Sequence, residues 1–210
     1  MEKRGILVGG GAFGREVLSW ANDRSGSDRV EFGYFLDADA SVLEPFDDFA
    51  LTYLGDPETY TPSDGDLFLV AIGSPLVKNR ICQRLADAGA QFATVVHPSA
   101  VVAQTAKIGI GVVIGPQSYI ATNSQLGDFS CVNSLSGIGH DVRVGRFCTV
   151  SSQVDVMGNA ELGDRVFVGS GACILPKVKI QQGSKIGAGS IVVKNLKEDS
   201  SVFAQPARQI

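Results

Sequence analysis

The chain has 210 residues, of which 44% are hydrophobic and 19% are charged, and its formal net charge is −4. The length allows one large domain or two small ones, and the acidic balance argues against nucleic acid as a main partner, because phosphate binding needs clustered lysine and arginine. No apolar run approaches the roughly 18 residues of a membrane-spanning helix, and residues 1–11 lack a signal-peptide pattern. We therefore expect a cytoplasmic protein without membrane insertion.

The four cysteines and two histidines limit the disulfide and metal chemistry open to this chain. The cysteines have no Cys-x-x-Cys spacing, so reduced thiols are the expectation for an intracellular protein. Two histidines cannot supply a dense His/Cys cluster, and we predict no metal site.

A short apolar strand over residues 5–9 is the first predicted element, and it leads into a glycine-rich turn and a helix. Gly9, Gly11 and Gly14 satisfy the pattern G-x-G-x-x-G. A strand, a glycine turn and a helix N-terminus together present free backbone N–H groups to an anionic phosphate. We predict substrate contacts at Gly9, Gly11, Ala12 and Phe13, although the glycines alone also fit a plain tight turn.

The second predicted strand ends at Asp37 and Asp39, where a carboxylate can accept hydrogen bonds from a ribose or a base. A third strand is predicted over residues 67–74 and a helix over residues 75–90. This order supplies one incomplete mononucleotide-binding half and no second half. A single nucleotide, or a nucleotide-linked metabolite, therefore fits this region better than NAD.

From Val96 to Val192 an aliphatic residue recurs at every sixth position without a slip, and the residue four places later is small or modestly apolar. Neither a helix nor an ordinary strand has this period, whereas a β-helix does. Each hexapeptide should form one side of a triangular prism, with three to a coil, and we expect the left-handed form. Glycine often follows the aliphatic residue, where a corner needs either a positive φ or close backbone approach.

The same register predicts where polar residues lie on the prism. His140 comes two residues after the inward Ile138, so it should lie on the outer surface near a corner. Gly158, eighteen residues later, should lie one coil above it and leave open space beside the imidazole. Ser170 and Ala188 form a second column, on a different corner.

Five segments resemble one family, the bacterial nucleotide-sugar and sialic-acid acetyltransferases, in which a Rossmann-like domain precedes a left-handed β-helix of hexapeptide repeats. They are the glycine loop VGGGAFGRE, the strand end FLDAD, the junction VVHPSAVV, the repeat itself and the segment IGHDVRVGRF. The resemblance implies an α/β Rossmann-like, nucleotide-sugar-binding domain over residues 1–94. It implies an all-β left-handed parallel β-helix over residues 95–210.

The resemblance implies an acetyl-CoA-dependent N-acetyltransferase that acts on a nucleotide-linked amino sugar. A sugar O-acetyltransferase of the sialic-acid type is the close alternative. A non-catalytic nucleotide-binding scaffold is a second alternative, and a nicotinamide-linked oxidoreductase is a distant third.

By resemblance, His140 is the general base, and Asp141 is the carboxylate that orients it or raises its basicity. The resemblance also implies coenzyme A contacts at Thr149, Gly158, Ser170 and Ala188. Because the base and the Ser170–Ala188 column lie on different corners, a complete site needs two subunits, and we expect a homotrimer. The sequence departs from the family at three places. Thr149 stands where some members have a second histidine, and Gln153 and Val154 replace the end of a small-residue motif that is often Gly-Ala. Residues 204–208, AQPAR, replace Gly-x-Pro-Ala-Lys/Arg.

Overall fold

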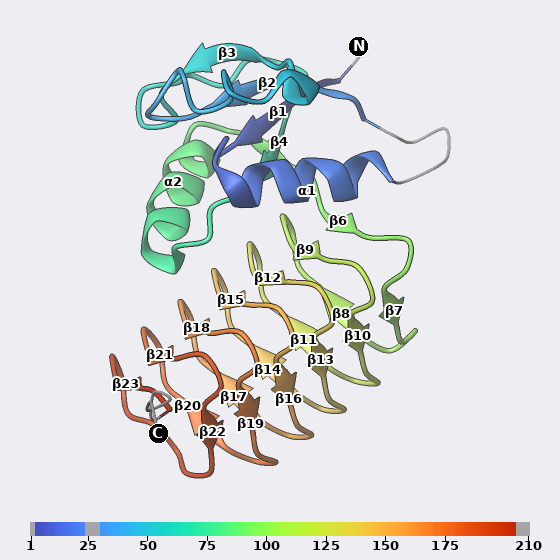
Figure 1. Ribbon diagram of the computed structural model, residues 1–210, viewed down its shortest axis with the longest axis vertical. Helices are drawn as coiled ribbons and strands as arrows, with labels where there is room; N and C mark the ends of the chain where they lie inside the picture. Colours follow the sequence, from blue (N-terminus) through green and yellow to red (C-terminus); the bar gives the residue numbers. More distant parts are fainter. Residues whose placement is uncertain (1–2, 24–29, 205–210) are drawn as a thin grey trace, which may run out of the picture.

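A five-stranded parallel sheet with two helices forms the amino-terminal part of the molecule (Figure 1). The computed structural model describes residues 3–23 and 30–204, so of the AQPAR segment only its first residue is included. The strands are β1 (Arg4–Val8), β2 (Phe32–Leu36), β3 (Thr52–Gly55), β4 (Asp66–Val70) and β5 (Gln91–Phe92), in the order β3-β2-β1-β4-β5. The helices are α1 (Ala12–Asn22) and α2 (Pro75–Asp87), and a short 3-10 helix spans Asp47–Phe49. The strands at β3 and β5 had no counterpart in the sequence prediction.

The centre of this sheet is apolar on both faces, because it is covered on each side. Ile6, Leu7 and Val8 of β1 are fully buried. Helix α1 buries Leu18 and Trp20, among other side chains, against the sheet and the neighbouring coils. The glycine turn leads directly into α1, which begins at Ala12.

The carboxy-terminal part is a solenoid of three parallel sheets (Figure 1). We call them the first, second and third faces, in the order in which the chain visits them. The first face contains β6 (Val95–Val96), β9 (Val113–Ile114), β12 (Cys131–Val132), β15 (Thr149–Val150), β18 (Phe167–Val168), β21 (Lys185–Ile186) and β23 (Ser201–Val202). The second contains β7 (Val101–Val102), β10 (Tyr119–Ile120), β13 (Gly137–Ile138), β16 (Asp155–Val156), β19 (Cys173–Ile174) and β22 (Ile191–Val192). The third contains β8 (Lys107–Ile108), β11 (Gln125–Leu126), β14 (Arg143–Val144), β17 (Glu161–Leu162) and β20 (Lys179–Ile180).

Strand pairing confirms the hexapeptide prediction. Ile120 pairs with Ile138, which in turn pairs with Val156, so each coil takes eighteen residues. The second residue of each strand points inward and forms one continuous apolar core. At roughly 1.5–3 kcal/mol for each fully buried aliphatic side chain, this core is the main favourable term in the solenoid's stability. The register changes only at the end, where Leu196 bridges to Ile180, sixteen residues earlier.

Close backbone approach, not positive φ, explains the glycines that follow the inward residues. The left-handed conformation lies two positions further along, as at Asn123 and Asp141, whose φ angles are 60° and 59°. A Cβ atom on Gly145 would lie 2.6 Å from the carbonyl carbon of Gly163 in the next coil. Of the two explanations offered by the sequence, the backbone contact is therefore correct.

The amino-terminal part packs against the first face of the solenoid through aromatic rings and a buried lysine. Phe92 of β5 contacts Phe129 edge-to-face at 4.7 Å, and Phe129 stacks on Phe147 at 5.3 Å. Lys78 of α2 is buried, and its Nζ donates hydrogen bonds to the carbonyl oxygen of Cys148 and to Oγ1 of Thr149, at 2.9 and 3.0 Å. These contacts fix which side of the prism carries the amino-terminal part.

Within the ranges 3–23 and 30–204, neither helix combines the length and hydrophobicity that a membrane crossing requires.

The glycine contacts lead to a stability prediction. Gly145→Ala should lower the free energy of unfolding by about 1–3 kcal/mol, because the new methyl group meets backbone atoms that cannot move aside independently. Gly137→Ala is the matched control, since its methyl group would meet only Oδ1 of Asp155, at 3.4 Å. Urea unfolding followed by circular dichroism compares the two variants. Equal losses would show that the coils are not held at this spacing in solution.

Candidate functional site

The glycine loop is held in place by the carboxylate that ends β2. Gly9 has a φ of 98°, which places it in the region that favours glycine. The N–H of Gly10 donates to Oδ2 of Asp37 at 2.7 Å, and the N–H of Asp39 donates to Oδ1 of the same carboxylate at 3.1 Å. Asp37 therefore holds the glycine loop through Oδ2 and its own turn through Oδ1, a role that the sequence analysis did not anticipate.

A pocket of about 380 Å³ opens above this loop. Five of the predicted substrate residues line it, namely Gly9, Gly11, Ala12, Phe13 and Asp37. Gly11 is the N-cap of α1 and supplies no side-chain hydrogen bond, so the first backbone N–H groups of the helix are available to an anion. The pocket is thus lined by a helix N-terminus and by carboxylates.

Asp39 differs from the other predicted substrate residues, because it does not line the pocket. Its Oδ1 accepts hydrogen bonds from the hydroxyl and the N–H of Ser41, at 2.7 and 2.9 Å. These bonds, the hydroxyl bond first, lower the pKa of the Asp39 carboxyl. Asp39 thus closes its own turn through Ser41.

His140 and Asp141 form a hydrogen-bonded pair at the corner between the second and third faces. Nδ1 of His140 lies 2.8 Å from Oδ2 of Asp141, and the two side chains are 61% and 46% exposed. Asn123, one coil below, donates from Nδ2 to the other Asp141 oxygen at 3.3 Å. The His140 bond is the largest cause, and the Asn123 bond the next, of a lowered pKa for the Asp141 carboxyl.

The space beside the imidazole depends on Gly158. The N–H of Asn159 donates to the carbonyl oxygen of His140 at 2.9 Å, which places Gly158 in the coil directly above. A Cβ atom at Gly158 would collide with Nε2 of His140. The absence of a side chain keeps Nε2 accessible, as the register predicted.

Ser170 and Ala188 are stacked and exposed at the corner between the first and second faces. The N–H of Gly189 donates to the carbonyl oxygen of Ser170 at 2.8 Å, which holds the two coils together. The prediction that this column lies on a different corner from His140 is confirmed.

Thr149, a predicted coenzyme A contact, is buried where the amino-terminal part meets the solenoid. It belongs to β15 on the first face and is only 3% exposed. Its Oγ1 accepts a hydrogen bond from Lys78 and donates one to the carbonyl oxygen of Gly73 at 2.9 Å. The register alone could not show this, because the amino-terminal part covers this stretch of the first face.

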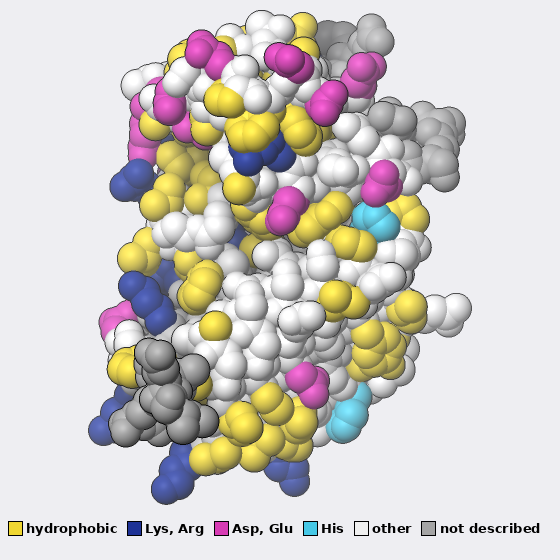
Figure 2. Space-filling view, viewed as in Figure 1, with side chains coloured by type: hydrophobic (Ala, Val, Ile, Leu, Met, Phe, Trp, Pro, Cys, Tyr) yellow, Lys and Arg dark blue, Asp and Glu magenta, His cyan; other side chains and the backbone are white. Residues whose placement is uncertain are grey.

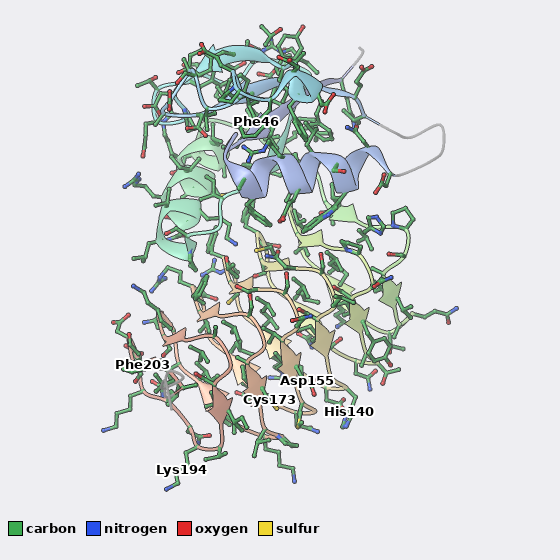
Figure 3. The ribbon with its side chains drawn as sticks, viewed as in Figure 1. Phe46, His140, Asp155, Cys173, Lys194 and Phe203 are labelled. Carbon is green, nitrogen blue, oxygen red and sulfur yellow. The ribbon has the colours of Figure 1, made fainter. Side chains whose placement is uncertain are left out.

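The pocket and His140 are on opposite sides of the molecule. The amino-terminal part covers the first face, whereas the corner between the second and third faces is the prism edge opposite that face. Figure 3 shows His140 at the solenoid edge far from α1 and α2. One chain therefore does not bring the glycine-loop pocket and the histidine together.

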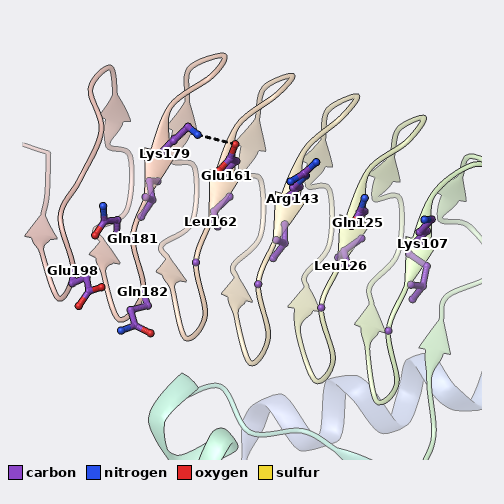
Figure 4. Close-up of a pocket in the computed structure, with 17 residues that line it drawn as sticks. Lys107, Gln125, Leu126, Arg143, Glu161, Leu162, Lys179, Gln181, Gln182 and Glu198 are labelled. Carbon is purple, nitrogen blue, oxygen red and sulfur yellow. Dashed lines mark ion pairs between the residues drawn. The ribbon is translucent and has the colours of Figure 1, made fainter.

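A second, larger hollow of about 680 Å³ runs along the third face, and none of the predicted site residues lines it (Figure 4). Its outward side chains are charged or amide-bearing, and Lys179 pairs with Glu161 at 3.1 Å. Within the described part of the chain, no group of three or more His, Cys, Asp or Glu residues is placed to hold a metal ion.

Sequence reasoning missed Asp56, Glu58 and Arg80, all of which line the glycine-loop pocket. Arg80 is on α2, and its guanidinium lies 2.7 Å from a carboxylate oxygen of Glu58. A helical arginine with an exposed side chain gives no motif, so only the packing of α2 beside the loop could identify it.

The comparisons with known proteins agree with this architecture. No family model matches the chain. The curated UDP-N-acetylbacillosamine N-acetyltransferase of Bacillus subtilis (strain 168) is 30% identical over 122 residues, which cover 53% of this chain and 50% of that protein. The matched region thus spans about half the length of this curated relative.

Solved structures match over nearly the whole chain. PerB from Caulobacter crescentus, solved in complex with CoA and GDP-perosamine, is 27% identical, with a TM-score of 0.85 and coverage of 99% of this chain and 97% of that chain. The acetyltransferase domain of PglB from Neisseria gonorrhoeae FA1090 is 24% identical, with a TM-score of 0.84 and coverage of 99% and 100%. The resemblance to sugar acetyltransferases is confirmed.

The pair at the corner predicts a titration. His140→Ala should raise the pKa of the Asp141 carboxyl toward its ordinary value, because the largest interaction that favours the carboxylate is lost. Asn123→Ala should raise it less. Carboxyl-carbon NMR during a pH titration measures both shifts, and Asp39, held by Ser41, should titrate unchanged in either variant. An Asp141 pKa that does not respond to His140→Ala would mean that the 2.8 Å contact does not persist in solution.

Proposed function

We propose that this protein is an acetyl-CoA-dependent N-acetyltransferase that acts on a nucleotide-linked amino sugar. The observation that carries the proposal is the exposed His140–Asp141 pair in a chain similar over its whole length to PerB, which was solved with CoA and GDP-perosamine. The glycine-loop pocket supports a nucleotide as the recognised part of the substrate. The solved complexes of similar proteins support acetyl-CoA as the acyl donor.

We infer that residues 1–94 form a Rossmann-like nucleotide-sugar-binding domain and that residues 95–210 form a left-handed β-helix. The strand order β3-β2-β1-β4-β5 supports the first inference, because a ligand at the carboxyl ends of β1 and β4 would occupy the switch point of a doubly wound sheet. The hexapeptide register supports the second.

In the proposed reaction the substrate amine attacks the thioester carbonyl carbon, and His140 acts through Nε2. The Nδ1–H of the imidazole is directed to Asp141, which leaves Nε2 free to accept the proton that the amine loses. The tetrahedral oxyanion then collapses, the C–S bond breaks, and the imidazolium returns the proton to the departing thiolate. No covalent enzyme intermediate is required, because acetyl-CoA already carries an activated acyl group.

Gly158 has a second role in this proposal. Its N–H donates to no acceptor within the described residues, and it lies one coil above the imidazole. A backbone N–H beside the base can donate to the oxyanion, where the developing charge makes a fixed donor most effective. Gly158 would thus leave room for the base and stabilise the intermediate.

We infer that the complete site forms between two subunits of a homotrimer. The pocket of one chain faces away from its own His140, so a neighbouring chain must supply one of the two. The second face supports such an association, because Val101, Tyr119 and Ile191 expose 59%, 49% and 68% of their surface there. Figure 2 shows hydrophobic side chains gathered on the lower part of the solenoid. A closed cyclic trimer matches a three-sided prism.

The first functional prediction concerns the base. His140→Ala should lower kcat by about 10²–10⁴-fold, because it removes general base catalysis, while coenzyme A affinity stays nearly unchanged. Asp141→Asn should have a smaller effect, since it leaves the imidazole in place. A thermal-shift screen of UDP-, dTDP-, GDP- and CMP-linked amino sugars identifies the substrate for steady-state kinetics. Wild-type turnover in His140→Ala would eliminate the proposed role.

The second functional prediction tests the shared site. His140→Ala and Ala188→Trp should each be inactive alone, and co-expression should restore activity in mixed trimers. In each mixed trimer one interface joins an intact His140 to an intact Ser170–Ala188 column. Light scattering must first establish that trimers form. Mixed trimers without activity, or a fully active monomer, would show that one chain holds the whole site.

A further inference from the structure

We propose that Arg80 binds the diphosphate of the nucleotide, and that Glu58 holds it in the ligand-free protein until the diphosphate takes Glu58's place. This inference rests on the proposed nucleotide site. It adds Arg80 to that site as the phosphate-binding cation and explains how Arg80 is released from Glu58 to bind the diphosphate.

The charges around the pocket make Arg80 distinctive. Among the described residues that line the pocket, three are acidic, Asp37, Asp56 and Glu58, and Arg80 is the one cation. A diphosphate that enters this pocket brings two further negative charges to an already acidic surface. Backbone N–H groups at the start of α1 can bind one phosphate, but an arginine is needed to offset the remaining charge.

The three carboxylates that line the pocket differ in the groups that they bind. Both oxygens of Asp37 accept backbone N–H groups, and Oδ1 of Asp56 accepts the N–H of Glu58 at 2.7 Å. Glu58 instead pairs with the Arg80 guanidinium at 2.7 Å. Asp37 and Asp56 thus bind backbone groups of the loops around the pocket. Glu58 instead binds Arg80, and Arg80 is the residue that a phosphate would attract.

The Arg80–Glu58 pair can exchange partners at little cost. The two side chains are 64% and 38% exposed, and an ion pair so accessible to water contributes little to stability. A diphosphate offers the guanidinium a stronger, bidentate partner than a single carboxylate oxygen. Ligand binding should therefore move Arg80 from Glu58 to the diphosphate without unfolding the loop.

A second arginine on the same helix provides a matched control. Arg84, four residues further along α2, donates from its guanidinium to the carbonyl oxygen of Tyr60 at 2.8 Å. Both arginines therefore tie α2 to the segment after β3, but only Arg80 lines the pocket. Loss of loop support alone would affect Arg84→Met and Arg80→Met in the same way.

The test is calorimetric titration of the full-length protein with UDP and GDP, and with uridine and guanosine by NMR. Arg80→Met should weaken diphosphate binding about 10- to 100-fold, the effect of losing a hydrogen bond to a charged group, while nucleoside binding stays within about twofold. Arg84→Met should leave both affinities near the wild-type values. Thermal unfolding of each variant verifies that it folds.

Glu58→Gln tests the exchange itself. It should tighten binding of the diphosphate by about 1.5- to 5-fold, because Arg80 no longer has to leave a carboxylate. In the Arg80→Met background the same change should tighten binding less, because only the repulsion between Glu58 and the diphosphate is then removed. Equal tightening in both backgrounds would show that Glu58 acts only by repulsion and would overturn the exchange.

The outcomes separate this inference from the proposed function. If the wild-type protein binds none of UDP, dTDP, GDP, CMP and the sugars linked to them, the nucleotide site and the role of Arg80 both fail. If the wild type binds a diphosphate and Arg80→Met binds it equally well, or Arg84→Met loses as much affinity, only the Arg80 inference is overturned.

Discussion

The stacking of one coil on the next, eighteen residues later, is the constraint on which the rest of this structure depends. Backbone N–H groups such as that of Gly139 donate to carbonyl oxygens of the coil above, here Val156 at 2.7 Å. Because every coil repeats this spacing, a side chain on one corner has a defined neighbour above and below. His140 is supported by Asn123 below through Asp141, and it is left open by Gly158 above. The chemistry proposed for this corner follows from the register.

The buried contact between Lys78 and the first face determines how the amino-terminal part is placed on the solenoid. An ammonium group removed from water is costly unless it is hydrogen-bonded, and here the carbonyl oxygen of Cys148 and the hydroxyl of Thr149 supply the acceptors. The contact places α2, and with it the glycine-loop pocket, over the first face. His140 is on the opposite edge of the prism, so the proposed nucleotide pocket and the proposed base are separated within one chain. The site that we propose between two subunits would bring them together.

Charged groups have different roles at the His140 corner and in the glycine-loop pocket. At the corner, a carboxylate with a lowered pKa orients an imidazole whose other nitrogen stays accessible. In the pocket, the Asp37 carboxylate binds the backbone of the glycine loop. Arg80, the one cation among the described lining residues, is held in an exposed ion pair with Glu58. The first arrangement suits a group that must exchange a proton, and the second suits a group that must exchange partners.

The sequence by itself determined the solenoid, its coil length and the identity of the corner residues, because a period of six has one structural solution and burial at that period is unambiguous. It also located the glycine loop, since the strand, turn and helix are local features. Tertiary structure alone decided the positions of Thr149, Asp37 and Arg80. Thr149 is covered because Lys78 of α2 and Gly73 contact it. Asp37 accepts a hydrogen bond from Gly10, 27 residues away, and Arg80 of α2 lines the pocket beside the glycine loop. None of these three depends on sequence spacing: each depends on which surfaces meet when apolar area is buried between distant segments.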